Sequence, residues 1–223
     1  SKRIPKKNIR KFHGKPIIQY SIEKAKLSGL FDDVIVSTDS EEIATISRQI
    51  GAVVPFVRPS YLSDDYSGTS PVLAHAVSWM YKNNWSVEMV CCIYATAPLM
   101  QVTDMLACYE KISTTKWDFV FPATEYMNPQ RTFSLGSRGE VEMFFPDEYS
   151  KRSQDLKSVY VDAGQFYWGT PEAWLESRKI FTNRSTVVVI PNNRVVDIDT
   201  EQDWNLAEEL FITTYDEQIK KLS

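Results

Sequence analysis

The stretch Asp33-Val34-Ile35-Val36-Ser37-Thr38-Asp39 decides the fold class of this 223-residue chain. Its short, continuous run of β-branched residues is typical of a strand that is buried on both faces. Asp39 or Ser40 then provides the N-cap of a helix, and Gly51 ends that helix. Because residues 52–57 return as a second apolar strand, the sequence predicts a β-α-β unit with two parallel strands.

The same alternation of strand and helix continues in both directions from this unit. Helices are expected at about 16–28, from 69, at 102–113 and from about 200, and strands at 87–94, 118–121, 165–168 and 187–190. Strands separated by helices of this length form a mainly parallel sheet with helices on both faces. We therefore predict one domain over residues 1–223 with a three-layer α/β/α, Rossmann-like fold, whose ligands bind beyond the carboxyl ends of the strands.

Residues 126–160 interrupt this rhythm. The interval contains the turn-forming groups Met127-Asn128-Pro129, Leu135-Gly136-Ser137-Arg138-Gly139 and Pro146-Asp147. These groups are typical of hairpins rather than of another helical crossover. We expect an inserted arm here, of the kind that builds an oligomer contact or covers a site.

The composition excludes several classes of function. A net charge of −4 and a pI near 5.3 disfavour binding to bulk nucleic acid or to an anionic membrane, so any anion site is local. The longest apolar stretch, around 89–100, is too short to span a bilayer. Cys91, Cys92 and Cys108 are an odd number, and two of them lie in an apolar run, which favours buried reduced thiols. We expect a soluble, cytoplasmic protein.

The opening stretch, residues 1–11, places six cations in an otherwise acidic protein. Ammonium groups and backbone N–H donors suit a polyphosphate, and Pro5 limits the conformations that present them. The alternative is a frayed basic terminus, which composition alone favours. The polar loop that begins at Arg58 follows a strand, so it can hold a nucleotide base or ribose, or it can be a solvated connection.

Asp197-Ile198-Asp199-Thr200 is more informative. In an extended segment the period of two turns both carboxylates to one side and Ile198 to the other. Two close carboxylates can hold Mg²⁺ together with substrate phosphates. The alternative is helix capping, because Thr200-x-x-Asp203 resembles a capping box. The two interpretations have equal weight on these residues alone.

Two segments combine a guanidinium, amides and aromatic rings. They are Arg152-Ser153-Gln154-Asp155-Leu156 and Asp162-Ala163-Gly164-Gln165-Phe166-Tyr167-Trp168. A sugar acid needs an Arg for its carboxylate and polar groups for its hydroxyls and amides. The aromatic residues taken singly are more often core residues. His13 and His75 match no metal or nucleophile pattern, and covalent catalysis is not indicated.

Together these segments resemble the CMP-sialic acid synthetase family, whose order of motifs nearly the whole chain follows. Residues 1–8 look like the second half of its nucleotide loop, Val36-Ser37-Thr38-Asp39 like its second strand, and residues 197–200 like its metal motif. The resemblance implies a nucleotidyltransferase fold, CTP as donor, Mg²⁺ as cofactor, and a homodimer whose interdigitated arms contribute to the partner's sugar site. In this family a strand and an Ala-Arg-Gly-Gly-like loop precede the position of Ser1.

The resemblance also implies roles for individual residues. The residues expected to contact the nucleotide are Ser1, Lys2, Lys7, Asn8 and Arg58. Asp197 and Asp199 are expected to bind the metal and, with Lys7, to act in catalysis. The residues expected to form the sugar pocket are Tyr94, Arg152, Gln154, Gln165 and Tyr167. The stretch Ile93-Tyr94-Ala95-Thr96-Ala97-Pro98 replaces a Gln-Pro-Thr-Ser-Pro-like stretch of N-acetylneuraminate enzymes and looks more like pseudaminic acid cytidylyltransferases.

The reaction that this resemblance implies is attack of a sugar's anomeric hydroxyl on the α-phosphorus of CTP, with release of pyrophosphate. The product would serve surface-glycan or flagellin glycosylation. Three alternatives stay open: N-acetylneuraminate or legionaminate as acceptor, a nucleotide-binding protein without turnover, and a nucleic-acid contact at the basic start, which the net charge disfavours.

Overall fold

The computed structural model describes residues 3–64, 67–126 and 129–222, with side chains up to residue 214 except at position 153. Its central sheet orders the strands β3 (Val90–Ile93), β8 (Phe166–Gly169), β4 (Phe119–Tyr126) and β7 (Val159–Asp162), while β9 (Ser185–Val189) pairs with β4. The predicted strands at 33–38 and 52–57 form the parallel bridges Ile35–Val53 and Thr38–Val57.

Three of the five strands in the central sheet run in one direction. β9 is parallel to β4, and β8 lies antiparallel between β3 and β4, so β3 and β4 also share a direction. β7 is antiparallel to β4. The predicted α/β fold is confirmed, and the sheet is mixed because the chain returns from residues 127–158 as β7 and β8, which both run antiparallel to β4 without a helical crossover. Between β7 and β8 the chain keeps its direction along β4, and Gly164 (φ 61°) adopts a left-handed conformation there.

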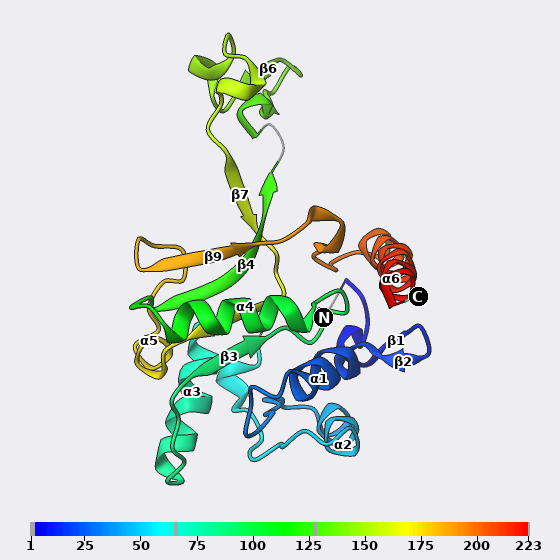
Figure 1. Cartoon of the computed structure of the whole chain (residues 1–223), viewed down its shortest axis with the longest axis vertical. Helices are drawn as coiled ribbons and strands as arrows, with labels where there is room; N and C mark the ends of the chain where they lie inside the picture. Colours follow the sequence, from blue (N-terminus) through cyan, green and yellow to red (C-terminus); the bar gives the residue numbers. More distant parts are fainter. Residues whose placement is uncertain (1–2, 65–66, 127–128, 223) are drawn as a thin grey trace.

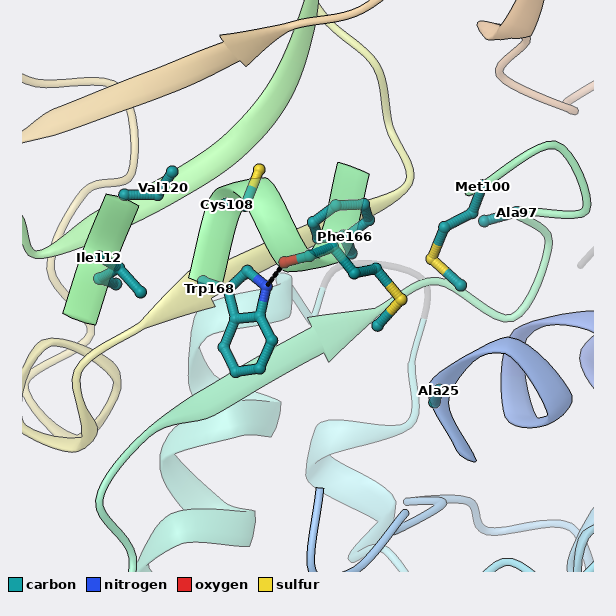
Figure 2. Packing of buried hydrophobic residues seen from close by; sticks show 9 residues of the cluster. Ala25, Ala97, Met100, Cys108, Ile112, Val120, Phe166 and Trp168 are labelled. Atoms are coloured by element: carbon teal, nitrogen blue, oxygen red, sulfur yellow. Dashed lines mark hydrogen bonds between the residues drawn. The ribbon is translucent and has the colours of Figure 1, made fainter. Parts of the chain in front are cut away.

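Helices cover both faces of this sheet, as predicted. Val120, Phe166 and Trp168 point to one face, where they pack against α1 (Ile17–Ser28) and α4 (Val102–Ser113). Figure 2 shows this cluster, including the hydrogen bond that the Trp168 indole donates to the Met105 carbonyl at 3.2 Å. Phe119, Phe121 and Tyr167 point to the other face, against α3 (Thr69–Lys82) and α5 (Pro171–Leu175). The alternation along β4 and β8 therefore builds three layers.

The helices begin and end where the sequence predicts. α2 (Glu41–Gln49) follows the N-cap Ser40, whose hydroxyl accepts a hydrogen bond from the Ile43 N–H at 3.4 Å. The unpredicted hairpin of β1 (Lys11–Phe12) and β2 (Lys15–Pro16) turns at His13 and Gly14, both with positive φ. Short 3-10 turns are η1 (Lys7–Ile9), η2 (Ser60–Leu62) and η6 (Asn192–Arg194).

A third hydrophobic cluster joins the two ends of the chain. Ile4, Phe12 and Tyr20 pack there against Ile198 and against Trp204 of α6 (Glu201–Leu222). Figure 1 shows that the N-terminal residues lie beside α6. The basic N-terminal stretch is consequently folded against the segment that carries Asp197 and Asp199.

The interval predicted as an arm projects from the sheet. β4 and β7 form its base, and beyond them lie the hairpin of β5 (Phe133–Leu135) and β6 (Val141–Met143) and the turns η3 (Pro129–Arg131), η4 (Pro146–Glu148) and η5 (Ser153–Asp155). Figure 1 shows this arm standing away from the body of the molecule. Among the described residues, no helix is long and apolar enough to cross a membrane.

Candidate active site

The basic N-terminal stretch is ordered around a left-handed residue. Ile4 is fully buried, and Lys6 has φ 52°, so the chain reverses into η1 directly before Lys7. The Lys7 ammonium donates a hydrogen bond to the Ile198 carbonyl and lies 3.4 Å from Asp199 Oδ1. The Arg3 guanidinium lies 2.9 Å from Asp199 Oδ2. The described part of this stretch is therefore not a frayed terminus, and it faces the predicted metal segment.

Not every nucleotide residue predicted from the sequence can be placed. Ser1 and Lys2 lie outside the described residues. Asn8 lies in η1 beside Lys7 and is half-buried. Arg3 was missed by the sequence analysis, although it belongs to the same six cations, because no motif distinguishes one cation of that run from another.

The segment 197–199 has the geometry that its alternation predicts. Ile198 is 1% exposed in the third cluster, whereas Asp197 is exposed and Asp199 is half-exposed. The surrounding protein removes part of the hydration of the Asp197 carboxyl, and the charge of Asp199 adds to this, so the pKa of Asp197 is raised. Lys7 partly offsets this effect. Asp197 and Asp199 therefore place two carboxylates close together, with the cations Lys7 and Arg3 beside Asp199.

The structure separates the capping interpretation from the metal interpretation. Asp203 Oδ2 accepts hydrogen bonds from the backbone N–H groups of Asp199 (3.1 Å) and Thr200 (2.7 Å), and the Thr200 hydroxyl accepts from the Asp203 N–H (3.3 Å). These bonds form the predicted capping box. Because Thr200 and Asp203 cap α6, helix capping does not account for the carboxylates of Asp197 and Asp199.

The carboxylates of Asp197 and Asp199 fit Mg²⁺. Hard oxygen donors suit this ion, which is held by one or two carboxylates together with substrate phosphates. No cluster of three or more His, Cys, Asp or Glu side chains that could hold a metal by itself occurs in the described ranges. Two carboxylates supply only part of the oxygen ligands that Mg²⁺ takes, so water or phosphate oxygens would complete such a site.

Arg58 is held close to the N-terminal end of α2 by three contacts. Its N–H donates to the Thr38 carbonyl at 2.9 Å, its Nη2 lies 3.5 Å from Asp39 Oδ1, and its Nε donates to the Ser63 hydroxyl at 3.2 Å. Lys6 also contacts this region, through a 2.7 Å ion pair with Glu42 in the first turn of α2. Arg58 and η1 are thus both attached to the beginning of α2.

Tyr94 directly follows β3, and Tyr167 lies within β8, where it is 3% exposed. Their ring centroids are 5.6 Å apart, and the Tyr94 hydroxyl lies 3.2 Å from the Thr69 hydroxyl. The Tyr167 hydroxyl donates to Asp162, and burial together with this bond raises the pKa of Tyr167. The charge of Asp162 also makes a small contribution to the raised pKa of Asp197. Asp162 opens the quoted motif but was not selected as a site residue.

Gln165 is buried, with 3% of its surface exposed. Its side-chain N–H donates to the Arg194 carbonyl at 2.6 Å, and its backbone carbonyl accepts from the Tyr94 N–H at 2.9 Å. Gln165 therefore connects the tyrosine pair with the chain that leads to Asp197.

Arg152 and Gln154 are exposed in the arm and are not brought together with Tyr94, Gln165 and Tyr167 in one chain. The arm residues around them are attached to η3: the Arg131 guanidinium donates to the Lys151 carbonyl at 3.0 Å, and the Gln130 amide donates to the Lys157 carbonyl at 2.8 Å. The two segments quoted for the sugar pocket are neighbours in sequence but lie at opposite ends of the β4–β7 ladder (Figure 1).

All three cysteines are free, and Cys92 and Cys108 are buried. Burial raises the pKa of both thiols to about 12. The thiols are therefore protonated and inert near neutral pH, as their apolar sequence context predicts. Acid, base and phosphate chemistry must come from the carboxylates and cations described above.

Comparisons with known proteins identify the family of the chain. A family model described as Cytidylyltransferase matches residues 1–217. A pseudaminic acid cytidylyltransferase of Campylobacter jejuni is 48% identical over 95% of this chain and 91% of its own length. A CMP-N,N'-diacetyllegionaminic acid synthase of Legionella pneumophila is 28% identical over 94% of this chain and 91% of its own length.

Solved structures support the fold. A CMP:2-keto-3-deoxy-manno-octonic acid synthetase complexed with CTP superposes with a TM-score of 0.68 at 15% identity, covering 96% of this chain and 95% of that protein. A 4-diphosphocytidyl-2C-methyl-D-erythritol synthase from Anaerococcus prevotii gives a TM-score of 0.60 at 13% identity, covering 91% of each chain. On the family match and on the 48% identity over nearly the whole chain, this protein belongs to the cytidylyltransferase family.

Proposed function

We propose that this enzyme transfers CMP from CTP to the anomeric hydroxyl of pseudaminic acid, a nine-carbon sugar acid of the sialic acid type, and releases pyrophosphate. The observation that carries the proposal is the convergence of Lys7 and Arg3 on Asp199 beside Asp197, in a chain 48% identical to a pseudaminic acid cytidylyltransferase. A 27% identical relative from Campylobacter coli, named Post-translational flagellin modification protein B, supports a role in flagellin or surface-glycan glycosylation.

In this proposal Lys7 and Arg58 bind the nucleotide, with Ser1, Lys2 and Asn8, and Asp197 and Asp199 hold Mg²⁺. When bound, Mg²⁺ supplies positive charge that polarises the reacting phosphate and neutralises the leaving pyrophosphate. Lys7 is held by the Ile198 carbonyl, so its ammonium stays at the same edge as the two carboxylates. Alignment and charge stabilisation then provide most of the acceleration, since transfer of this kind asks little covalent chemistry of a protein.

The acceptor sugar is placed against Tyr94 and Tyr167, with Gln165 between this pocket and the metal segment. Arg152 supplies a guanidinium for the sugar carboxylate and Gln154 an amide for its polar groups, both from the arm of a second copy. Two observations support a homodimer. Arg152 and Gln154 lie away from their own chain's tyrosines, and the arm exposes large apolar side chains, which mark interfaces: Phe133 (53%), Leu135 (67%), Val141 (60%), Phe144 (62%) and Tyr149 (66%).

The reaction is assigned to the cytoplasm. Its support is the set of free cysteines, two of them deeply buried, which suits a reducing compartment. CTP and the sugar acid are the only partners that the proposal requires besides the second copy.

The test of the acceptor is pyrophosphate release with CTP, Mg²⁺ and a panel of pseudaminic, N,N'-diacetyllegionaminic and N-acetylneuraminic acids. We expect pseudaminic acid to give the highest kcat/KM by at least about tenfold, since a site built to hydrogen-bond one arrangement of polar groups leaves them unpaired with another. Equal or reversed preference would remove the acceptor assignment but keep the cytidylyltransferase. Absence of pyrophosphate with all three acids, despite CTP binding, would favour nucleotide binding without turnover.

The test of the shared site uses hybrids. Arg152→Ala and Asp197→Asn each inactivate every site of a homodimer, but a hybrid of the two has one intact site if Arg152 acts in the partner's pocket. Mixing the two variants after partial denaturation and refolding should restore about a quarter of wild-type activity, the value that random pairing of two kinds of subunit gives. No recovery in a mixture that sedimentation shows to be dimeric would place Arg152 in its own chain's site or outside any site.

A further inference from the structure

The segment that carries Asp197 and Asp199 is not part of the sheet. After β9 the Ile190 N–H donates to the Ala123 carbonyl at 2.8 Å, and η6 then turns the chain away. Residues 195–199 pair with no strand among the described residues. Ile198 fixes the far end of the segment in the third cluster. No sheet ladder therefore sets the position of the two carboxylates, and the start of the segment at residue 195 needs another anchor.

Arg194, the last residue of η6, is held at both its backbone and its side chain. Gln165 Nε2 donates to the Arg194 carbonyl at 2.6 Å. Arg194 Nη1 lies 2.9 Å from Asp104 Oδ2, in the first turn of α4, and their side chains are only 17% and 11% exposed. Gln165 directly precedes β8, which begins at Phe166. Arg194 is therefore held to the sheet through Gln165 and to α4 through Asp104.

This ion pair is not explained by stability alone. Lys24 of α1 donates to the Pro98 carbonyl at 2.7 Å, and its charge also acts on Asp104 and Arg194. Burial lowers the pKa of Lys24 to about 8, and Arg194 adds to this effect. Removing such charges from water costs free energy, and apolar residues of similar volume in the same place would avoid this cost. A buried charged group is better explained where it fixes a conformation.

We propose that Gln165, Arg194 and Asp104 form a positioning clamp that holds residues 195–199 so that Asp197 and Asp199 face the bound nucleotide. The clamp rests on the metal site of the proposed function. Partners that orient metal ligands without touching the metal commonly change metal affinity when they are replaced. Because the Gln165 carbonyl also holds the Tyr94 N–H, the same residue fixes the tyrosine pair relative to the two carboxylates.

The experiment measures CTP affinity by calorimetry, without acceptor, once with Mg²⁺ and once with EDTA. The ratio of the two affinities is the Mg²⁺-dependent gain. Gln165→Met keeps the length of the side chain but removes the donor to Arg194, and Asp104→Asn removes the ion pair. Both variants should lose about tenfold of the gain while binding CTP in EDTA like wild type. Arg194→Lys keeps the carbonyl and a cation, and should keep most of the gain.

Asp118→Asn is the matched control. Asp118 is likewise a buried Asp paired with guanidinium groups, of Arg178 and Arg184, but it lies at the other end of β4. This variant should lose stability and keep the full gain. Melting temperatures are measured for all variants. If Asp104→Asn does not fold, Gln165→Met decides by itself, since it removes a single neutral hydrogen bond.

The clamp and the metal site fail in different ways. A wild-type gain in folded Gln165→Met and Asp104→Asn, with the gain lost in Asp197→Asn, would overturn the clamp alone. A wild-type gain in Asp197→Asn would overturn the proposed metal site and the clamp with it. If Asp118→Asn also loses the Mg²⁺-dependent gain in CTP affinity, then any loss of stability has this effect, and the proposed clamp is contradicted.

Discussion

Asp118 and the pair Asp197 and Asp199 are acids with basic partners at opposite ends of the strands β4 and β9. Asp118 precedes β4, is 5% exposed, and accepts hydrogen bonds from Arg178 Nη1 at 2.9 Å and Arg184 Nη2 at 2.7 Å. Hydrogen bonds from Arg184, then from Arg178, lower the pKa of Asp118. Asp197 lies beyond the end of β9, is exposed, and has a raised pKa.

The two sites differ in how the protein itself pairs the charge of each carboxylate, and this difference distinguishes a structural acid from one that can bind a ligand. At Asp118 one carboxylate meets two guanidiniums, so its charge is satisfied by the protein itself. At Asp197 two carboxylates repel one another, and the neighbouring cations Arg3 and Lys7 form their ion pairs with Asp199, so that within the described ranges Asp197 has no cation paired with it. The unsatisfied site is at the carboxyl ends of the strands, where ligands bind in α/β sheets.

The largest effect on stability is expected at the satisfied site. Asp118→Asn leaves Arg178 and Arg184 without their carboxylate and should lower the free energy of unfolding by about 2–3 kcal/mol, as lost hydrogen bonds to charged groups do. Urea unfolding measures this loss, and turnover below the transition should stay near wild type. A stable variant without activity would reverse the assignment of the two sites.

The loss of unfolding free energy caused by Asp118→Asn should depend on pH. Because the folded pKa of Asp118 lies below its ordinary value of 3.8, its stabilisation is present above that pH and is lost as the pH falls through the folded pKa. The difference in unfolding free energy between wild type and Asp118→Asn should therefore be constant near neutral pH and shrink below about pH 4. A difference that grows in acid would contradict the ion-pair account.

Single cations near Asp197 and Asp199 or at the start of α2 are expected to affect CTP binding rather than folding. Lys7→Ala and Arg58→Ala should each weaken CTP binding by about 1.5–3 kcal/mol, the range for a charge-assisted hydrogen bond, with little change in melting temperature. Lys15→Ala is the control, since Lys15 forms an exposed pair with Glu23, a kind of pair that contributes little. Calorimetry with CTP measures all three. Wild-type affinity in both test variants would leave Lys7 and Arg58 as structural residues.

Much of the fold could be predicted because local patterns determine it. The capped helix after Asp39 and the helix at 102–113 follow from spacing and caps. The antiparallel direction of β8 could not be predicted, since an apolar run such as Phe166-Tyr167-Trp168 has the same pattern in either direction.

The alternation of residues 197–199 could be predicted because it is local to one short segment, and Ile198 is indeed buried between two more exposed carboxylates, whereas their role as metal ligands stays a prediction. The predicted site was incomplete where residues distant in sequence meet: Asp104 and Arg194 are a buried pair that neither local pattern indicates. Arg152 and Gln154 were grouped with Gln165 and Tyr167 because they are near in sequence, but β7 carries the chain from the arm back to the body between them.

The central claim is that Asp197 and Asp199 bind Mg²⁺ for CMP transfer rather than stabilise the fold. Pyrophosphate release against Mg²⁺ concentration, with melting temperatures, tests it for wild type, Asp197→Asn, Asp199→Asn and Asp118→Asn. Turnover should collapse in the first two variants with little change in melting temperature, because the pair of Asp199 with the exposed Arg3 contributes at most about 1 kcal/mol. Asp118→Asn should show the opposite pattern. Active Asp197→Asn and Asp199→Asn enzymes with wild-type Mg²⁺ dependence would contradict the account.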